Sequence, residues 1–434
     1  MIGSVPRLVI AGSASGVGKT TTMVALTAAL RARGLRVATF KCGPDYLDPT
    51  YHARASGSAC HNLDGWMMGR QAVLATFARN TRDADVALVE GMMGLFDGKD
   101  PMSEEGSAAQ IAKWLGAPVI AVVDASALVR TIAALGVGLR AFDPALDVAG
   151  LFANRVGSRA HLDMHVRASA AHVPVVGGLP ADASHAFPER YMGLRAADEA
   201  FDATAWGQVF GEWNDVEALL ALARRAAPLE IAAEPRPARA HSCRIAVARD
   251  EAFHFYYYDN LARLEALGAE LVPFSPLRDA RVPDVDGVYI GGGYPEAYAR
   301  QLAANRSMRQ SLRNATIYAE CGGLMYLADA IRTLDGMEHE MVGVIRGTAV
   351  MHERLQAIGY VDVETTRPTL FGPRGTRLRG HEYRWSALEG GEPNAYRDQP
   401  AYATDKVLAT YVHVHWASNP AAAESFVARC GSKR

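Results

Sequence analysis

The sequence predicts an α/β protein made of two doubly wound domains, each a parallel sheet with helices on both faces. Short apolar runs alternate with segments of helical periodicity, and this alternation is interrupted once before it resumes. Apolar runs bounded by turn residues are typical of strands buried on both faces of a parallel sheet. With 434 residues, of which 49% are hydrophobic, the chain can bury a core in each of two domains.

An N-terminal domain is expected over residues 1–228. Its predicted strands are residues 7–11, 35–40, 86–90, 118–124 and 148–154. A loop of small residues at 12–18 and a helix over 19–33 follow the first strand. Because the strands are expected to be parallel, functional groups should gather where their carboxyl ends meet.

The interruption lies at residues 226–244, which are rich in Ala and Pro and show no periodicity. This composition is typical of an interdomain linker. We therefore place the linker at 229–244 and a C-terminal domain at 245–434. Its predicted elements are strands at 245–248, 271–274, 287–290 and 316–320 and a helix over 261–267.

Charge and composition exclude several classes of protein. The 45 basic and 47 acidic residues give a net charge of -2, without the basic surface that gathers nucleic acid. The five cysteines are widely spaced, which argues against a zinc site or a disulfide framework. No apolar stretch is long enough to cross a bilayer, and no signal peptide is recognisable. We expect a cytoplasmic protein that binds small molecules and a second copy of itself, and neither nucleic acid nor membrane.

Residues 12–20 read GSASGVGKT and join the first strand to the first helix. Glycines allow a loop to turn its N–H groups toward phosphate oxygens, and the helix N-terminus adds partial positive charge. In this arrangement Lys19 reaches the terminal phosphates and Thr20 binds Mg²⁺. The predicted phosphate-binding residues are Gly12, Ser15, Gly16, Gly18, Lys19, Thr20 and Thr21. Ser13 stands where the usual pattern has its first glycine, so the alternative is a glycine-rich turn that contains a lysine.

Acidic residues follow the second and third strands, in KCGPDYLD at 41–48 and EGMMGLFDG at 90–98. Both segments should face the phosphate loop, and a hard cation needs oxygen ligands. We predict that Thr20, Asp45 and Glu90 hold Mg²⁺. We assign Tyr46, Asp48 and Asp97 to the substrate. Taken alone, each carboxylate could instead cap a turn beside Gly or Pro.

The displaced glycine of the loop resembles that of dethiobiotin synthetase and its relatives, which activate a carboxylate or carbamate with ATP. The resemblance implies a dethiobiotin-synthetase-like N-terminal domain with ATP as co-substrate. It also implies that Asn154, at the end of the fifth strand, contacts adenine. Spacing alone fits a turn residue at this position equally well.

In the second half, Cys321 lies between a predicted strand and a helix, in YAECGGLMYL at 318–327. A sharp strand-to-helix turn exposes its middle side chain, and a helix N-terminus favours the thiolate form of a cysteine. The alternative is a buried structural cysteine. Backbone N–H groups of Gly292, Gly293 and Gly322 would form an oxyanion hole.

A histidine close to the C-terminus completes this set, because it can act as the base for Cys321 and as the acid for departing ammonia. The stretch YVHVHW at 411–416 offers His413 and His415. The order of cysteine turn, glycine strand and late histidine resembles class I glutamine amidotransferases. Those enzymes usually end in His-Pro-Glu, which aligns His413 with the base and His415 with the glutamate that orients it. The orienting carboxylate is therefore expected to be missing or replaced.

The two halves together resemble the cobyrinic acid a,c-diamide synthase family, including its hydrogenobyrinic acid variant. The resemblance also rests on FANRVGS at 152–158, ARDEAFHFYYYDNL at 248–261 and GGGYPE at 291–296. It implies a C–N bond-forming ligase of cobalamin biosynthesis. ATP would phosphorylate the a and c side-chain carboxylates of the macrocycle, and ammonia released from glutamine at Cys321 would displace phosphate. It further implies a homodimer.

Three alternatives remain open at this stage. Cobyric acid synthase performs the same chemistry on other carboxylates, and nickel-sirohydrochlorin a,c-diamide synthase is similar in sequence. A non-catalytic P-loop partitioning or metal-insertion protein belongs to a different class. The intact Cys321 turn and the glycine-rich strand argue against that third alternative.

Overall fold

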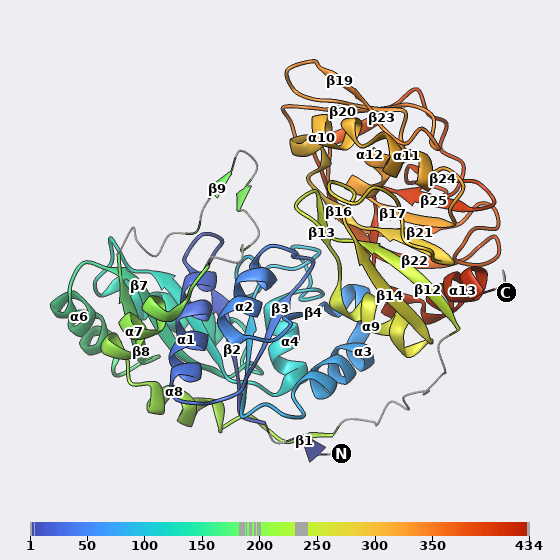
Figure 1. The fold of residues 1–434 in the computed structure, drawn as a ribbon. Coiled ribbons are helices and arrows are strands. Elements are labelled where there is room, and N and C mark those ends of the chain that lie inside the picture. Colours follow the sequence, from blue (N-terminus) through green and yellow to red (C-terminus); the bar gives the residue numbers. More distant parts are fainter. Residues whose placement is uncertain are drawn as a thin grey trace. The chain divides into compact units, whose positions relative to one another are not determined.

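The computed structural model describes residues 2–3, 5–181, 187, 189–190, 193–194, 197, 201–230 and 242–431. Contacts divide the chain into two compact units, Met1–Glu234 and Pro235–Arg434. Figure 1 traces the first in blue to green and the second in yellow to red. The division falls within the predicted linker, whose residues 231–241 lie outside the described part. The first two residues of the predicted linker form strand β11 (Leu229–Glu230), and its last two begin strand β12 (Cys243–Ala248).

The described part of the first unit contains a seven-stranded parallel sheet in the order β4-β3-β5-β2-β6-β7-β8. Its strands are β2 (Arg7–Gly12), β3 (Val37–Cys42), β4 (His61–Leu63), β5 (Val86–Glu90), β6 (Val119–Asp124), β7 (Val148–Val156) and β8 (Val175–Pro180). The five predicted strands are present, and β4 and β8 extend the sheet at its two edges. Short antiparallel pairs join β1 (Ile2–Gly3) to β11, and β9 (Glu189–Arg190) to β10 (Gly193–Leu194).

Helices follow most of these strands (Figure 1). They are α1 (Lys19–Ala32), α2 (Asp48–Ser56), α3 (Gly65–Asn80), α4 (Ala108–Leu115), α5 (Thr131–Phe142), α6 (Arg159–Ser169), α7 (Thr204–Trp213) and α8 (Val216–Ala223). Helix α1 packs against α2, α7 and α8, while α3 contacts α4 and α5 contacts α6. A buried cluster that includes Leu8, Ile10 and Phe152 joins α1, α7 and α8 to the sheet.

Packing rather than capping stabilises α1. Its N-cap residue, Gly18, provides no side-chain hydrogen bond, which costs a few tenths of a kcal/mol relative to a good cap. Met23, Leu26 and Leu30 are almost completely buried on this helix, and burying each contributes about 1.5–3 kcal/mol. The helix is therefore stable although its N-terminal N–H groups have no side-chain partner, and these groups stay available to an anion.

The second unit is built on the sheet β14-β12-β15-β17-β25-β24, in which all neighbours are parallel except the antiparallel edge strand β24. Its strands are β12, β14 (Ala269–Phe274), β15 (Gly287–Ile290), β17 (Ile317–Glu320), β24 (Ala401–Ala403) and β25 (Val407–Thr410). The four strands predicted in this half are β12, β14, β15 and β17. Its helices are α9 (Tyr258–Ala266), α10 (Ala299–Ala304), α11 (Arg306–Leu312), α12 (Gly322–Leu327), α13 (Pro420–Gly431) and the short 3-10 helices Pro295–Tyr298 and Trp416–Ser418.

Smaller sheets, which the periodicity did not predict, complete this unit. Two are antiparallel: β21-β22-β26 (Ala357–Glu364, Arg377–Arg384, His413–Val414) and β13-β16 (Phe253–Phe255, Gly292–Gly293). The third is β19-β18-β20-β23 (Glu338–Glu340, Ala330–Arg332, Thr348–Met351, Ser386–Glu389), in which only the central β18-β20 pair is parallel. Strand β22 pairs with β26 so that His381 lies opposite His413. The α/β class with two sheet-based units is confirmed. Within the described residues, no helix combines the length and apolar character needed to cross a membrane.

Candidate active sites

The predicted phosphate loop joins β2 to α1 and is anchored to two neighbouring strands. The Ser13 N–H group donates to the Val122 carbonyl of β6 at 2.9 Å. Asn154 of β7 donates from its side-chain amide to the Val17 carbonyl at 2.9 Å. Asn154 is thus a strand residue that braces the loop, and not a turn residue. Its contact with adenine stays a prediction.

Gly18 is the position in this loop where only glycine fits. Its φ angle is 93°, and a Cβ atom added there would lie 1.9 Å from the Asn154 amide nitrogen. Both the backbone conformation and the space therefore exclude other residues. The remaining residues predicted to bind ATP are contiguous with it in the loop and the first turn of α1: Gly12, Ser15, Gly16, Lys19, Thr20 and Thr21.

Lys19 folds back over the loop. Its ammonium group donates to the Ala14 carbonyl at 3.0 Å, and its side chain is largely buried. Burial and the nearby Lys41 charge lower the pKa of Lys19, while Glu90 acts in the opposite direction. The ammonium group thus lies over the loop at which the sequence predicts phosphates to bind.

A second lysine, Lys41 at the end of β3, is buried among three carboxylates. Its Nζ atom lies 2.5 Å from Asp48 Oδ2, 2.9 Å from Glu90 Oε1 and 3.5 Å from Asp45 Oδ2. Burial alone lowers the pKa of Lys41, but the three negative charges outweigh it and raise that pKa well above its ordinary value. Lys41 therefore stays protonated. No motif points to Lys41, although a charged residue within a buried strand was a signal that could have revealed it.

Thr20 joins this cluster from the start of α1. Its hydroxyl group donates to Glu90 Oε1 at 2.9 Å and lies 3.3 Å from Asp48 Oδ2. The other Glu90 oxygen pairs with the His52 ring. The structure thus brings together Thr20 and Glu90 of the predicted metal ligands. The hydrogen-bond neighbour of Thr20, however, is Asp48, which was assigned to the substrate, and not Asp45.

The other residues predicted to contact the substrate, Tyr46 and Asp97, lie in loops, and their contact with the substrate stays a prediction. Asp97 accepts the Gly94 N–H group at 2.8 Å and so caps the turn in its own loop. Tyr46 is half-buried in the loop between β3 and α2. Beside it, Asp45 accepts the Asp48 N–H group at 3.1 Å through Oδ1. Capping of turns, the alternative reading for single carboxylates, thus applies to Asp97 and to one oxygen of Asp45.

The oxygen atoms around Thr20 suit Mg²⁺, a hard cation that binds hydroxyl and carboxylate groups. The described residues contain no group of three or more His, Cys, Asp or Glu that could hold a metal ion alone. Mg²⁺ commonly uses only one or two protein carboxylates together with water and substrate phosphates. Thr20, Asp48 and Glu90 fit such an ion when a nucleotide supplies the remaining oxygens.

In the second unit, Cys321 occupies a strained turn between β17 and α12. Its φ and ψ angles are 47° and -104°, a combination that costs about 1–3 kcal/mol for a residue other than glycine. The Cys321 N–H group donates to the Thr410 carbonyl at 2.7 Å, which anchors the turn to β25. This is the sharp strand-to-helix geometry expected of a nucleophile.

His413 is the histidine that the structure brings to Cys321. Burial lowers the pKa of His413, but interactions with Cys321, which hydrogen-bonds the ring, and with Glu320 more than offset burial and raise the pKa to about 10. A Cβ atom at Gly292 would lie 2.5 Å from His413 Cε1. Gly292 therefore has to be glycine for the ring to lie where it does.

The three predicted oxyanion-hole glycines also meet near this turn. Gly292 and Gly293 form β16, and Gly322 begins α12, where N–H groups have no partner within the helix. The Cβ position of Gly322 lies 3.1 Å from the Gly293 nitrogen. The structure thus places this strand directly beside the residue that follows Cys321.

His415 has different surroundings. Its Nδ1 atom accepts the Ala417 N–H group at 3.3 Å, and its ring packs on Tyr257 with centroids 4.8 Å apart. Burial lowers the pKa of His415 to about 4, so it is neutral near pH 7. It cannot supply the negative charge of the glutamate with which it aligns.

A carboxylate from another part of the chain is nevertheless present at His413, so of the two expectations, missing or replaced, the structure supports the second. Glu320 Oε2 lies 3.5 Å from His413 Nδ1, and Glu320 is completely buried. It precedes Cys321 in the chain, whereas the glutamate of the usual His-Pro-Glu ending follows the histidine. An acidic residue inside the buried run IYAE at 317–320 was the signal that could have revealed it.

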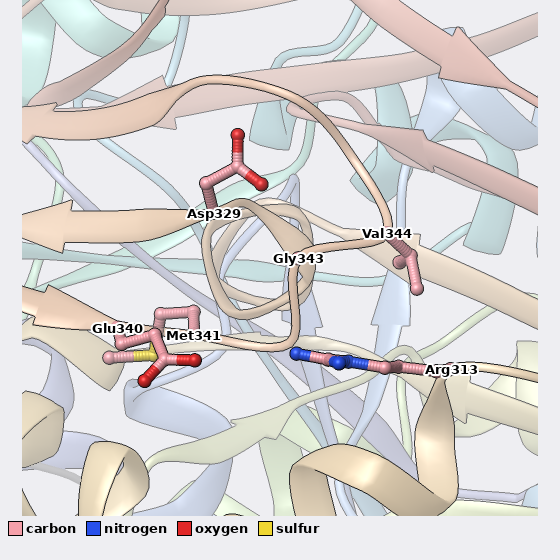
Figure 2. Close-up of a pocket in the computed structure, with 6 residues that line it drawn as sticks. All are labelled: Arg313, Asp329, Glu340, Met341, Gly343 and Val344. Carbon is pink, nitrogen blue, oxygen red and sulfur yellow. The ribbon is translucent and has the colours of Figure 1, made fainter.

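Elsewhere in the second unit, a cavity of about 470 Å³ is lined by Arg313, Asp329, Glu340, Met341, Gly343 and Val344 (Figure 2). None of the predicted site residues lines it. Its charged groups already have partners: Arg313 donates to the Val342 carbonyl at 3.0 Å, and Asp329 accepts the Gly347 N–H group at 2.9 Å. We assign no chemistry to this cavity.

Comparison with known proteins matches both units to families. Residues 8–192 match the CobQ/CobB/MinD/ParA nucleotide binding domain, and residues 244–421 match the CobB/CobQ-like glutamine amidotransferase domain. Cobyrinate a,c-diamide synthase of Leptospira interrogans is 47% identical over 448 residues, covering 98% of each chain. The cobyrinate a,c-diamide synthase of Syntrophotalea carbinolica is 45% identical, covering 98% of this chain and 99% of its own. That of Dehalococcoides mccartyi strain CBDB1 is 40% identical, covering 97% of each chain.

The chain belongs to the cobyrinate a,c-diamide synthase family.

This membership in the cobyrinate a,c-diamide synthase family confirms the resemblance drawn from the motifs. It also confirms an amide-forming synthase with a nucleotide-binding domain and a glutamine amidotransferase domain. The two clusters described above lie inside the two matched ranges, one around Thr20 and the other around Cys321.

Proposed function

We propose that this protein uses ATP and glutamine to amidate the a and c side-chain carboxylates of cobyrinic or hydrogenobyrinic acid, as a C–N ligase of cobalamin biosynthesis. The observation that carries the proposal is the presence, on one chain of this family, of a braced phosphate loop and a strained Cys321 beside His413. The first site fits activation of a carboxylate, and the second fits release of ammonia from glutamine.

In the first site, backbone N–H groups of the loop and the Lys19 ammonium group would bind the ATP phosphates. A carboxylate oxygen of the macrocycle attacks the γ-phosphorus, the bond to ADP breaks, and an acyl phosphate forms. Mg²⁺, held by Thr20 with Glu90 or Asp48, would neutralise phosphate charge there. Lys41 offsets the charge of both carboxylates, so they remain ionised close to the nucleotide.

In the second site, the Cys321 sulfur attacks the side-chain amide carbon of glutamine. The N–H groups of Gly292, Gly293 and Gly322 are the candidates to stabilise the oxyanion. His413 gives its proton to the departing nitrogen, which leaves as ammonia. Water then hydrolyses the glutamyl thioester to glutamate and regenerates the thiol. Ammonia attacks the acyl phosphate carbon and phosphate leaves, so each cycle converts one carboxylate to an amide.

The partners in this proposal are small molecules, namely ATP, glutamine and the macrocycle, together with a second copy of the chain. The homodimer follows from the family resemblance. Light scattering after size-exclusion chromatography measures it directly, and a monomeric mass at working concentration contradicts it. The macrocycle assignment follows from the names of the relatives.

The experiment that tests the two-site proposal compares nitrogen sources in Cys321→Ser. With MgATP and the macrocycle, the variant should lose glutamine-dependent amidation by a factor of at least about 10³ and keep amidation with ammonia near the wild-type rate. Normal use of glutamine by Cys321→Ser removes Cys321 from the reaction. Loss of both activities in a folded variant contradicts the division into two sites.

A further inference from the structure

We propose that Glu320 positions His413, so that the carboxylate of the amidotransferase site comes from the strand before the nucleophile. The inference rests on the proposed glutaminase activity of Cys321. Class I enzymes that end in His-Pro-Glu take this group from two residues after the histidine, where this chain has the neutral His415. The geometry points to Glu320 as the source of the carboxylate beside His413.

The strand register places Glu320 at the site. Glu320 is the last residue of β17 and pairs with Thr410 of β25, three residues before His413. Its Oε2 atom lies 3.5 Å from His413 Nδ1, and its Oε1 atom accepts the Val414 N–H group at 3.2 Å. One oxygen therefore faces the ring, and the other is tied to the backbone next to that ring.

Two buried tyrosines hold the carboxylate in place. Tyr289 donates its hydroxyl to Glu320 Oε2 at 3.1 Å, and Tyr318 donates to Oε1. Burial and the Glu320 charge raise the pKa of both phenols well above the ordinary value, so both remain donors. Together with the Val414 N–H group, these two hydroxyls give the buried carboxylate three hydrogen-bond donors, which fix its orientation toward His413.

The other titratable groups around His413 are less suited to this role. The His381 ring stacks on His413 with centroids 5.0 Å apart, and burial lowers the pKa of His381 well below its ordinary value. Glu382, the next residue on β22, pairs with Arg384 at 3.6 Å, and burial raises its pKa. His415 is neutral near pH 7 for the same reason as His381. Glu320 is thus the group that supplies negative charge at Nδ1.

The test measures glutaminase activity of the full chain with MgATP and the macrocycle, for wild type and Glu320→Gln. We expect kcat to fall on the order of 10²-fold with KM changed less than about threefold, because the ring loses its orientation but the glutamine site is intact. Without the carboxylate the imidazolium is less stable, so the alkaline limb of the pH–rate profile should move to lower pH. A role in packing alone predicts no such movement.

Several variants keep this test decisive. Glu320→Asp should recover part of kcat, and Glu338→Gln, at an exposed glutamate of the same unit, should match wild type. Ammonia-dependent amidation reports folding and should be unchanged in all of them. If Glu320→Gln does not fold, Tyr289→Phe replaces it: losing one hydroxyl from Oε2 should strengthen the attraction to His413 and move the alkaline limb to higher pH.

The outcomes separate the inference from the function on which it rests. A wild-type chain without glutaminase activity contradicts the proposed function. An active wild type together with unchanged kcat and pH profile in Glu320→Gln overturns the role of Glu320. An alkaline limb that does not move in Tyr289→Phe overturns it as well when Glu320→Gln cannot be purified.

Discussion

Lys41 keeps its ammonium group buried because three carboxylates surround it. Lys41 in turn keeps Asp48 and Glu90 ionised, whereas burial and the Asp48 charge raise the pKa of Asp45 to about 7. Its distances of 2.5 Å to Asp48 and 2.9 Å to Glu90 are those of strong charge-assisted hydrogen bonds. Removing one member of a buried ion pair leaves its partner uncompensated, which is costlier than losing an exposed pair.

Lys41→Met should destabilise the first unit strongly. We expect its free energy of unfolding to fall by about 3–5 kcal/mol, because Asp48 and Glu90 are left buried without a cation. Thermal unfolding followed by calorimetry measures the loss. The matched control is Lys113→Met, which removes a more exposed pair with Asp143 and should cost no more than about 1 kcal/mol. Equal losses in the two variants would mean that Lys41 does not compensate the cluster.

Glu90→Gln should impair amidation with both nitrogen sources. The variant removes the oxygen charge next to Thr20, so metal-bound ATP is held less well and the carboxylate is not activated. We expect amidation to fall by a factor of at least about 10² with glutamine and with ammonia alike. Glu217→Gln, at an exposed glutamate, is the control. Normal turnover in Glu90→Gln would show that Glu90 acts only in local structure.

At the scale of elements, a strand-to-helix turn supports each site: β2 to α1 around the phosphate loop, and β17 to α12 around Cys321. The sequence predicted both turns because their strand, small residues and helix follow one another in the chain. It did not predict the antiparallel strand β22, whose His381 lies opposite His413. That pairing joins residues 32 positions apart, and local periodicity carries no information on such pairings.

Gly18→Ala should weaken ATP binding for two reasons. The φ angle of 93° costs about 1–2 kcal/mol for any other residue, and the new Cβ also meets the Asn154 amide. Gly34→Ala is the matched control for conformation, since φ there is 81° with no atom near the added Cβ. Calorimetric titration with ATP should show a large loss of affinity for Gly18→Ala and none for Gly34→Ala. Unchanged ATP affinity in Gly18→Ala would contradict the assigned loop.

At the scale of the whole molecule, the residues that the sequence could identify differ from those that it could not in where their partners lie along the chain. Lys19, Thr20 and Cys321 lie within local motifs, so the order of residues revealed them. Lys41 and Glu320 act through partners that only the folded sheets bring near. For the same reason the sequence could not tell that Asp48, and not Asp45, lies within hydrogen-bond distance of Thr20.

The second unit should lose stability in mild acid. The pKa of buried His415 is lowered to about 4, whereas in the unfolded chain it is near 6.5. Between these values the unfolded state binds more protons, so the free energy of unfolding falls as pH decreases from about 6.5 to 4, by up to about 3 kcal/mol for this group. His415→Gln should flatten the dependence in calorimetric scans of the full chain. An unaltered slope would show that His415 does not titrate in this way.

The central claim is that one chain couples ATP and glutamine to two amidations of a macrocycle. The most direct measurement is mass spectrometry of the product after incubation with MgATP and glutamine, with cobyrinic acid, hydrogenobyrinic acid and nickel-sirohydrochlorin in parallel. We predict that cobyrinic or hydrogenobyrinic acid exchanges two hydroxyl groups for amino groups. Exchange on nickel-sirohydrochlorin alone, or on none of the three while ATP still binds, would contradict the claim.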